Sequence, residues 1–541
     1  MPEPLERIPA VTADESDTPY QAALSGLAAH ELVFAVVGPV GSGTSQIASD
    51  LNELLEPRGF KSNILKAREV IEAEARPQFP PRATPFQIAH ALQDAGDQLR
   101  KSSNDNAVVA VGLVELIRKK RAEIQGDKIE PSVAVEPDGS RHAYILDSIR
   151  HPEEVELLRR VYQDAFCLIG VFCEESERLQ RLTEKFSQGA GKDDILSFMG
   201  RDENAPETYG QQVSDAFHLS DYFVDNTVRR IQPAAGRREN NPDWDVPDQL
   251  GRLVEILTRG EIVRPSPNEM GMFHAYGARM RSSCLSRQVG AALLDRSGTL
   301  IATGTNEVPR AGGGLCGSNS SAHHSTDFRC HAHNGFCTNT MEQNRIREEL
   351  IESVRSTLKP NDEELTALEG QIGRSPIGQL LEFSRSVHAE MDALLSAGRN
   401  GIPTVATKLF VTTFPCHNCA RHIVAAGVEE VQYIEPYLKS KAIPLHGDAI
   451  VTDRRQWISP FADNQGAGDP NVLFRPFIGV APRLYRRAFL ERKPLKDPQT
   501  GYMVDRGGRD EKYPRTEILK VSYPQVEAYL TRLKSENQPT P

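Results

Sequence analysis

The apolar positions along the chain fall into two stretches in which strand-like and helix-like patterns alternate. In the first stretch, residues 32–37 (LVFAVV) form a continuous apolar run that ends in glycines, as a buried parallel strand does, and residues 46–55 follow a helical period. The same stretch contains strand-like segments at 143–146 and 166–172 and helix-like segments at 152–162 and 176–186. This alternation predicts a parallel α/β domain over residues 26–230.

The second stretch follows a polar connector. Residues 231–248 are rich in proline, asparagine and charge, which predicts a linker over residues 231–255. Beyond it we predict a helix at 269–283, a hairpin of strands at 289–295 and 300–304, a helix at 388–397, a strand at 408–412, a helix at 416–426 and a strand at 430–434. We therefore expect a second α/β domain over residues 256–541, interrupted by an insertion over about 309–375.

Composition narrows the class of protein. Of the 541 residues, 39% are hydrophobic and 25% are charged, which is typical of a soluble globular protein. The formal net charge of −11 disfavours attraction of a nucleic-acid substrate, and no apolar run approaches the roughly 18 residues that a membrane span needs. Residues 1–25 are polar and acidic, so we expect a mobile tail rather than a signal peptide, and a cytoplasmic protein.

Three residues in the second domain have the spacing of a catalytic zinc site. His388 stands two positions before Glu390, and Cys416 and Cys419 follow after one predicted strand. One imidazole and two thiolates leave the fourth tetrahedral position of zinc to water, whose pKa the metal lowers towards neutrality. Glu390 reaches that water without binding the metal, so we predict that it moves the protons.

Each half of this pattern has a simpler interpretation when taken alone. A single Cys-x-x-Cys is often structural zinc or a redox pair, and a single His-x-Glu is usually a surface pair. Their combination in this order, with a strand and Pro415 between them, favours catalytic zinc. The combination matches the signature of the nucleobase deaminases.

Further segments resemble the deoxycytidylate deaminase branch of the cytidine deaminase superfamily. They are residues 284–291 (CLSRQVGA), 302–309 (ATGTNEVP), 388–395 (HAEMDALL), 412–423 (TTFPCHNCARHI) and 434–437 (IEPY). The resemblance implies a cytidine-deaminase-like α/β/α domain, a small deoxycytidine nucleotide as substrate, Asn306 as a contact to the sugar, and a homo-oligomer. The chain departs from the family's Gly-Tyr-Asn-Gly at Thr305 and Glu307.

The first domain contains a candidate phosphate-binding loop. Residues 38–45 (GPVGSGTS) follow an apolar strand and open a helix, which is the setting of such a loop. Its members are Gly38, Gly41, Ser42, Gly43, Thr44 and Ser45. Thr44 replaces the usual lysine, so phosphoryl transfer is not expected, whereas Ser45 and Asp147 could organise Mg²⁺ beside a bound nucleotide. The alternatives are a structural relic for the domain, and a helix cap or turn for Asp147.

The order of the two domains resembles a known group of bacterial proteins. Residues 149–158 (IRHPEEVELL) and the pair Arg201 and Asp202 are similar to segments of small nucleotide kinases and dephospho-coenzyme A kinases. A P-loop kinase-like domain followed by this deaminase resembles the bacterial anti-phage dCTP deaminases. That resemblance implies depletion of deoxycytidine nucleotides in antiviral defence, controlled through the first domain by an inhibitory or activating regulator.

A second set of cysteines and histidines lies in the insertion. Its members are Cys316, His323, His324, Cys330, His331, His333 and Cys337, with Cys284 as a candidate neighbour in space. Cys284, Cys316, Cys330 and Cys337 could close a structural zinc site that fixes a polar loop. Their spacing matches no common zinc finger, and the alternative is a loop around the substrate entrance.

Three functions compete at this stage. The leading one is hydrolytic deamination of dCTP, dCMP or both. The second is deamination of RNA or DNA, which the acidic charge and an aromatic content of only 6% disfavour. The third is a P-loop nucleotide-sensing switch with a vestigial deaminase, which the intact set of His388, Glu390, Cys416 and Cys419 disfavours.

Overall fold

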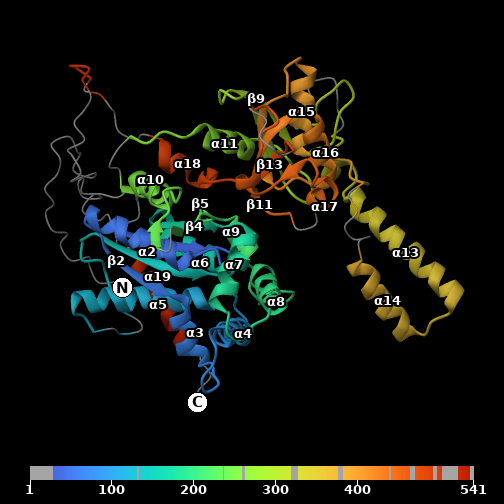
Figure 1. The fold of residues 1–541 in the computed structure, drawn as a ribbon. Coiled ribbons are helices and arrows are strands. Elements are labelled where there is room, and N and C mark those ends of the chain that lie inside the picture. The colour runs from blue at the N-terminus through green and yellow to red at the C-terminus, as the bar shows by residue number, and fades with distance from the viewer. Residues whose placement is uncertain are drawn as a thin grey trace, which may run out of the picture. The chain divides into compact units, whose positions relative to one another are not determined.

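The computed structural model divides the chain into two compact units (Figure 1). Unit 1 comprises Met1–Arg264 together with Ile478–Pro541, and unit 2 comprises Pro265–Phe477. The structure describes residues 29–128, 130, 133–234, 237–258, 262–317, 327–375, 380, 382–437, 440–462, 469–490, 496, 498–502 and 522–536. The tail predicted over residues 1–25 lies outside them.

Unit 1 contains a six-stranded sheet in the order β14-β5-β4-β1-β3-β2. Its strands are β1 (Glu31–Val37), β2 (Lys61–Lys66), β3 (His142–Ile149), β4 (Phe166–Phe172), β5 (Tyr222–Asp225) and β14 (Gly479–Val480). The first five are parallel, and β14 is antiparallel to β5. Val33 and Ala35 of β1 contribute to one hydrophobic core and Leu32 and Phe34 to another. Both faces of β1 are therefore buried, which explains its continuous apolar run.

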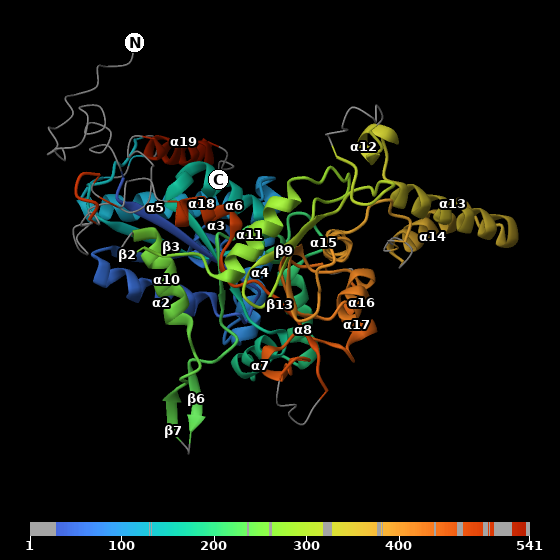
Figure 2. The same ribbon diagram turned by 90° about the horizontal axis from the view of Figure 1, so that it is seen from above.

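Helices and a small hairpin complete unit 1. The helices are α2 (Thr44–Leu55), η1 (Glu56–Arg58), α3 (Ala67–Ala75), α4 (Pro85–Ser103), α5 (Val108–Gln125), α6 (Pro152–Tyr162), η2 (Gln163–Ala165), α7 (Glu175–Lys185), α8 (Lys192–Glu203), α9 (Val213–Phe217), α10 (Val246–Thr258), α18 (Pro482–Phe489) and α19 (Tyr523–Glu536). The hairpin of β6 (Ile231–Ala234) and β7 (Arg237–Asn240) extends away from the sheet of this unit (Figure 2). The helices predicted at 46–55, 152–162 and 176–186 are α2, α6 and α7, with ends shifted by at most two residues.

The domain boundaries differ from the prediction. The segment predicted as a linker at 231–255 contains the β6–β7 hairpin and most of α10, whose Val246, Leu250 and Leu253 are buried in a core of unit 1. The range 256–541 was expected to be one domain, but its last part returns to unit 1 as β14, α18 and α19. Because polar residues precede α10, the segment was predicted as a linker although α10 is amphipathic. The edge strand β14 is too short to show a hydrophobic pattern.

A buried group of charges joins the returning helix α19 to unit 1. The guanidinium of Arg121 donates to the Glu31 carboxylate at 2.7 and 2.9 Å and to the Glu527 carboxylate at 2.6 and 3.2 Å. The hydroxyls of Tyr162 and Tyr523 donate to Glu527 and Glu31 at 2.8 and 2.6 Å. Burial tends to lower the pKa of Arg121, but the two facing carboxylates raise it well above its ordinary value. This pairing makes α19 an integral part of unit 1.

Unit 2 contains a second six-stranded sheet, in the order β12-β13-β11-β10-β8-β9. Its strands are β8 (Gly290–Leu294), β9 (Leu300–Thr305), β10 (Thr407–Thr413), β11 (Val428–Glu435), β12 (Ile450–Val451) and β13 (Val472–Pro476). β8 pairs antiparallel with β9 and β10, whereas β10, β11, β13 and β12 run parallel. The predicted hairpin and the strands at 408–412 and 430–434 are confirmed. With its helices, unit 2 is a mixed α/β structure.

The helices of unit 2 include those of the predicted insertion. They are α11 (Pro267–Arg279), α12 (Cys330–His333), α13 (Thr338–Leu358), α14 (Asp362–Arg374), α15 (Ala389–Arg399), α16 (His417–Ala425), α17 (Ala442–His446) and η4 (Arg454–Gln456). α13 and α14 form a helical hairpin that extends away from the sheet of unit 2, and no residue of α13 is buried (Figures 1 and 2). In the described part of the chain, no helix has the length and apolar character that crossing a membrane requires.

Candidate metal centre and substrate pocket

The three predicted metal ligands come together at the starts of two helices. His388 is the N-cap of α15, Cys416 is the N-cap of α16, and Cys419 lies in the first turn of α16. The Nδ1 atom of His388 lies 3.3 Å from the Sγ atoms of both Cys416 and Cys419. Among the described residues, this is the one group of three metal-binding side chains whose ligand atoms all lie within 4.8 Å of one another.

These positions fit a zinc ion. Tetrahedral zinc with Zn–N of about 2.0 Å and Zn–S of about 2.3 Å separates the nitrogen and sulfur ligands by roughly 3.6 Å. The distance of 3.3 Å from the His388 nitrogen to each sulfur is close to that value. A set of three protein ligands leaves one tetrahedral position for water or substrate, as catalytic zinc sites do.

The electrostatics of the two thiols differ. Hydrogen bonds from Cys419 and His388 lower the pKa of Cys416 to about 4, although burial opposes this. The hydrogen bond to Cys416, together with burial, raises the pKa of Cys419 well above its ordinary value. The hydrogen bond with Cys416 raises the pKa of His388 to about 9. Cys416 is therefore ready to serve as a thiolate ligand, and its position at a helix N-terminus favours that charge.

Glu390 lies beside the metal ligands and is almost completely buried. It belongs to the first turn of α15, and its side chain is 4% exposed. Burial raises its pKa to about 7, and the charge of Cys416 adds to this effect while His388 opposes it. A carboxyl group with such a pKa can both accept and release a proton near neutral pH.

A close contact between β9 and α15 places these groups. A Cβ atom on Gly304 would lie 2.0 Å from the carbonyl oxygen of Ala389, so only glycine permits this approach. The backbone N–H of Thr305 donates to the Asp392 carboxylate at 3.1 Å, which holds α15 against the end of β9. Glu307 and Val387 then pair as an isolated bridge, which brings the residues after β9 next to His388.

Asn306 lies in the pocket wall, but its side chain is already engaged. Its Oδ1 accepts from the backbone N–H of Val289 at 2.7 Å, and its Nδ2 donates to the carbonyl oxygen of Arg287 at 2.7 Å. The neighbouring Glu307 was not predicted as a site residue. It is 2% exposed and accepts from the backbone N–H and hydroxyl of Ser283 at 2.9 and 2.7 Å. The departure from the family's glycine at this position was the signal that could have identified it.

The metal ligands open into a cavity of about 320 Å³. Its lining includes His388, Glu390, Cys416 and Asn306. Sequence reasoning missed several other lining residues, namely Ser286, Arg287, Thr338, Asn339, Ser384, Arg385, Ser386, Thr413 and Tyr437. Thr338, Asn339 and Arg385 belong to or follow the insertion, where no family motif marks them.

The predicted second metal set is only partly gathered. Cys284, Cys330 and Cys337 line the same cavity, whereas Cys316 does not, and His323 and His324 lie outside the described residues. In the described part of the chain these cysteines do not reach the mutual distances of a three-ligand metal group. Burial tends to raise the pKa of Cys337, but hydrogen bonds from Ser286 and from the first turn of α13 lower it.

The candidate phosphate loop of unit 1 lies between β1 and α2. Gly41 and Gly43 have φ angles of 86° and 90°, in the left-handed region that favours glycine. The hydroxyl of Ser45 donates to the Asp147 carboxylate at 2.7 Å, so the two residues that were predicted to share Mg²⁺ are in contact. Thr44 is largely buried at the start of α2.

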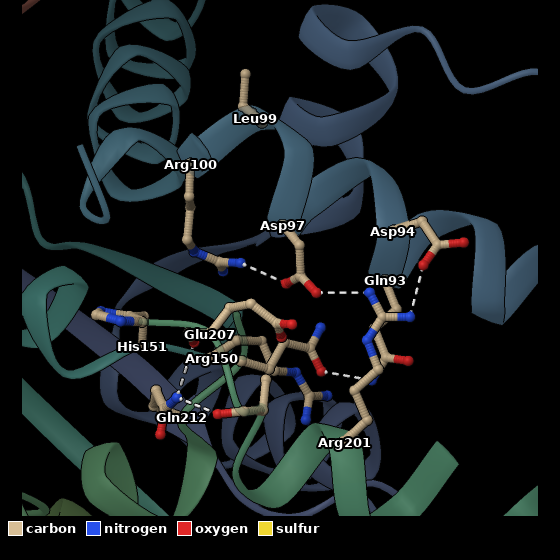
Figure 3. A network of polar contacts seen from close by, with 12 residues as sticks. Gln93, Asp94, Asp97, Leu99, Arg100, Arg150, His151, Arg201, Glu207 and Gln212 are labelled. Atoms are coloured by element: carbon tan, nitrogen blue, oxygen red, sulfur yellow. Dashed lines mark hydrogen bonds and ion pairs between the residues drawn. The ribbon is translucent and has the colours of Figure 1, made fainter. Parts of the chain in front are cut away.

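The charged groups around this loop are paired with one another. The backbone N–H of Val40 donates to the Asp202 carboxylate at 2.6 Å, and Arg150 donates to the same carboxylate at 2.8 Å. Close by, Arg201 bonds to Asp94 at 2.5 Å and to Asp97 at 2.7 Å (Figure 3). Arg100 bonds to Glu154 at 2.8 Å. Val40, Arg150 and Arg201 thus donate to carboxylates of the same unit.

Comparison with known proteins identifies the family. The model of the "Cytidine and deoxycytidylate deaminase zinc-binding region" matches residues 266–435. The deoxycytidylate deaminase of Enterobacteria phage T4 is 30% identical over 167 residues, which are 31% of this chain and 77% of the phage protein. That of Saccharomyces cerevisiae is 29% identical over 302 residues, 54% of this chain and 76% of the yeast protein.

Solved structures add a weaker similarity. The crystal structure of the dCMP deaminase from cyanophage S-TIM5 in complex with dCMP and dUMP is 20% identical and covers 34% of this chain and 93% of that chain. Its TM-score of 0.21 is too low to support an argument about the fold. The family model, the match to most of the phage T4 enzyme and the zinc-compatible site therefore carry the assignment: the chain belongs to the cytidine and deoxycytidylate deaminase family.

Proposed function

We propose that unit 2 removes the exocyclic amine of free deoxycytidine nucleotides by hydrolysis. The reaction converts dCMP to dUMP, or dCTP to dUTP, with release of ammonia. The observation that carries this proposal is the buried Glu390 beside a zinc-compatible group of His388, Cys416 and Cys419, opening into one cavity. The similarity to deoxycytidylate deaminases supports a deoxycytidine nucleotide as the substrate.

The residues of the site have distinct roles in this reaction. His388, Cys416 and Cys419 would hold zinc, which, when bound, supplies a Lewis acid that makes water a nucleophile near neutral pH. Glu390 takes one proton from the attacking water and delivers it to the ring nitrogen, and then moves the second proton of that oxygen to the amine, which leaves as ammonia. Because Glu390 is buried, its raised pKa lets it carry this proton in both directions. Asn306 holds the backbone of residues 287–289 in the pocket wall, next to the sugar in this proposal.

The size of the cavity favours a free nucleotide over a polynucleotide. A volume of about 320 Å³ lies at the lower end of the range for small-molecule sites, roughly 300–1,000 Å³. The chain has a net charge of −11 and few aromatic side chains on which extended nucleic acid could stack.

The direct test is release of ammonia by the purified full chain. It should be offered dCTP, dCMP, CTP, cytidine and a cytosine-containing oligonucleotide, with Glu390→Ala as the control. Activity on the deoxynucleotides that is lost in Glu390→Ala would support the proposal and fix the preferred number of phosphates. Activity on the oligonucleotide alone would replace it with polynucleotide deamination.

We further propose that unit 1 binds a nucleotide with Mg²⁺ at residues 38–45 and thereby controls the deaminase. The contact between Ser45 and Asp147 at 2.7 Å supports this, because both groups are suited to organising one cation. Replacing Ser45 by alanine should weaken binding of Mg²⁺-ATP and Mg²⁺-ADP in calorimetric titration. Equal affinity of the variant and the unaltered protein would contradict nucleotide binding at this loop.

The biological role that we propose is depletion of the dCTP pool in anti-phage defence, by a homo-oligomer under the control of a regulator. This proposal rests on the resemblance in domain order. Phage replication and cellular dCTP should both fall in cells that carry the active chain, compared with cells that carry Glu390→Ala. Unchanged dCTP during infection would contradict it.

A second zinc held by Cys284, Cys316, Cys330 and Cys337 is a separate proposal. Three of these cysteines line one cavity, but they would have to move closer together to bind a metal. Metal analysis should then give two zinc ions per chain, falling to one in Cys330→Ser. One zinc ion in both proteins would leave these cysteines as pocket residues.

A further inference from the structure

Glu307, which stands where the family has glycine, is a buried carboxylate behind the deaminase cavity. Its side chain is 2% exposed, and it is not among the described residues that line the cavity. The carboxylate accepts from the backbone N–H and the hydroxyl of Ser283 at 2.9 and 2.7 Å, and from the backbone N–H of Val308 at 2.9 Å. Burying a carboxylate is costly unless donors satisfy it, and these three do. The side chain thus makes a contact to Ser283 that glycine cannot make.

The segment that Glu307 contacts forms an irregular part of the cavity wall. Residues 282–289, which we call the wall segment, lie between α11 and β8 and belong to no helix or strand. Cys284, Leu285, Ser286 and Arg287 of this segment line the cavity, and the last three of these are exposed. An exposed, irregular segment has few packing contacts that fix it. Its position therefore depends on the hydrogen bonds at its two ends.

Two consecutive residues hold the two ends of the wall segment. Glu307 binds its start through the N–H and hydroxyl of Ser283. Asn306 binds its end, because its side chain accepts from the N–H of Val289 and donates to the carbonyl oxygen of Arg287, both at 2.7 Å. Loss of the Glu307 side chain would leave the side-chain contacts of Asn306 at the other end of the segment.

The backbone of Glu307 is fixed beside the metal centre. Its N–H donates to the carbonyl oxygen of Val387 at 3.2 Å, and the N–H of Val387 donates to the carbonyl oxygen of Glu307 at 3.0 Å. Val387 immediately precedes the metal ligand His388. Glu307 therefore connects two parts of the site, since its backbone holds the residue next to His388 and its side chain holds Ser283.

We propose that Glu307 is a positioning residue of the deaminase, which holds the wall segment at a fixed place relative to the metal centre and thereby sets the affinity for substrate. It acts through Ser283 and does not itself touch the substrate. The inference rests on the proposed deamination of deoxycytidine nucleotides. It predicts that Glu307 affects binding of the substrate more than the chemical step, because the metal ligands and Glu390 stay in place without its side chain.

The kinetic test compares Glu307→Ala and Glu307→Gln with the unaltered full chain on dCMP and dCTP. Glu307→Ala removes both bonds to Ser283, so KM should rise about tenfold while kcat stays within about threefold. Glu307→Gln keeps an oxygen that can accept from Ser283 and should recover most of the affinity. An unchanged KM in Glu307→Ala would overturn the positioning role.

Glu429→Ala is the matched control. Glu429 is also a buried carboxylate of unit 2 that accepts from a serine hydroxyl, that of Ser459, and it is not among the described residues that line the cavity. Its replacement should leave KM unchanged. An equal rise of KM in this variant would overturn the positioning role, because loss of a buried carboxylate elsewhere in unit 2 would then have the same effect.

Hydrogen exchange separates this inference from the proposed reaction, because it requires no turnover. Backbone amides of the wall segment should exchange about tenfold faster in Glu307→Ala, with exchange in α15 unchanged. Ser283→Ala removes only the hydroxyl bond and should give a smaller increase, which keeps the test decisive if Glu307→Ala does not fold. Faster exchange without turnover by the unaltered protein would overturn the proposed reaction and leave the positioning role standing. Turnover by the unaltered protein, with unchanged exchange in both variants, would overturn the positioning role.

Discussion

The phosphate loop of unit 1 and the cavity of unit 2 both look suited to an anion, but two arginines near the loop and one in the cavity differ in their hydrogen bonds. Around the loop, Arg150 and Arg201 are bonded to carboxylates of the same unit. In the cavity, Arg385 keeps a buried nitrogen that has no partner among the described residues. A donor that is already paired is not free for a ligand, whereas an unpaired donor can still bind an acceptor.

This difference reverses the ranking that motifs alone would give. The loop at residues 38–45 has a known pattern, yet its surroundings supply their own carboxylates, among them Asp202 on Val40. Arg385 belongs to no motif, yet it lines the cavity with a buried nitrogen that has no partner among the described residues. Pairing therefore has to be examined before a motif is taken as a binding site.

The largest effect should come from Glu390→Gln. The amide cannot exchange protons with the substrate, so kcat should fall about 10³- to 10⁴-fold, or roughly 4–5 kcal/mol in the barrier. Steady-state ammonia release measures this, and metal analysis should show that zinc is retained. Glu369→Gln on the exposed helix α14 is the control. Retention of more than a tenth of the activity would mean that another group moves the protons.

Glu527→Gln tests whether the paired charges of unit 1 serve the fold. It leaves Arg121 buried with one carboxylate fewer, and such a loss costs about 3–5 kcal/mol. Thermal and denaturant unfolding of the full chain should show a large loss of stability. Glu536→Gln on the same helix removes only an exposed pair with Arg532 and should cost less than about 1 kcal/mol. Similar losses in the two variants would show that burial of the pair is unimportant.

Asn306→Ala examines an intermediate case, a polar residue that is paired and also lines the cavity. Losing its two bonds to the backbone of Val289 and Arg287 should cost about 1–3 kcal/mol. We expect kcat/KM for dCMP to fall about tenfold or more, together with a lower unfolding temperature. A fall in kcat/KM without any change in stability would indicate direct contact with the sugar instead.

Asp202→Asn should have the smallest effect. It removes a negative charge from the phosphate loop while keeping an acceptor for the N–H of Val40. The affinity of unit 1 for Mg²⁺-ADP should rise about tenfold, equivalent to about 1.4 kcal/mol. Calorimetric titration measures this, with the exposed Asp193→Asn as control. An unchanged or weaker affinity would show that Asp202 does not compete with a ligand.

The sequence allowed accurate prediction where the chemistry is local. His388 and Glu390 are two residues apart, and Cys416 and Cys419 share one helix turn, so spacing predicts that each pair lies together, and the match to the deaminase signature predicts that the two pairs meet. Strand β1 was evident because both of its faces are buried.

Other features depend on contacts between distant residues, which periodicity cannot show. Arg121 meets Glu527 across 406 positions, so neither residue indicates the other. The sequence around Arg385 likewise does not indicate that one of its nitrogens is buried without a partner among the described residues. Both facts depend on the three-dimensional arrangement of side chains. The boundary between the units near residue 478 likewise depends on contacts in the folded chain.

The return of the chain to unit 1 also sets an order of events during synthesis on the ribosome. The strands β1 to β5 emerge early, but β14 and α19 follow only after all of unit 2 has been translated. Until Glu527 emerges, Arg121 has only Glu31 as a carboxylate partner in its buried position. A nascent chain therefore completes its first unit last, and a chain that terminates early loses the edge strand and closing helix of the unit that it began with.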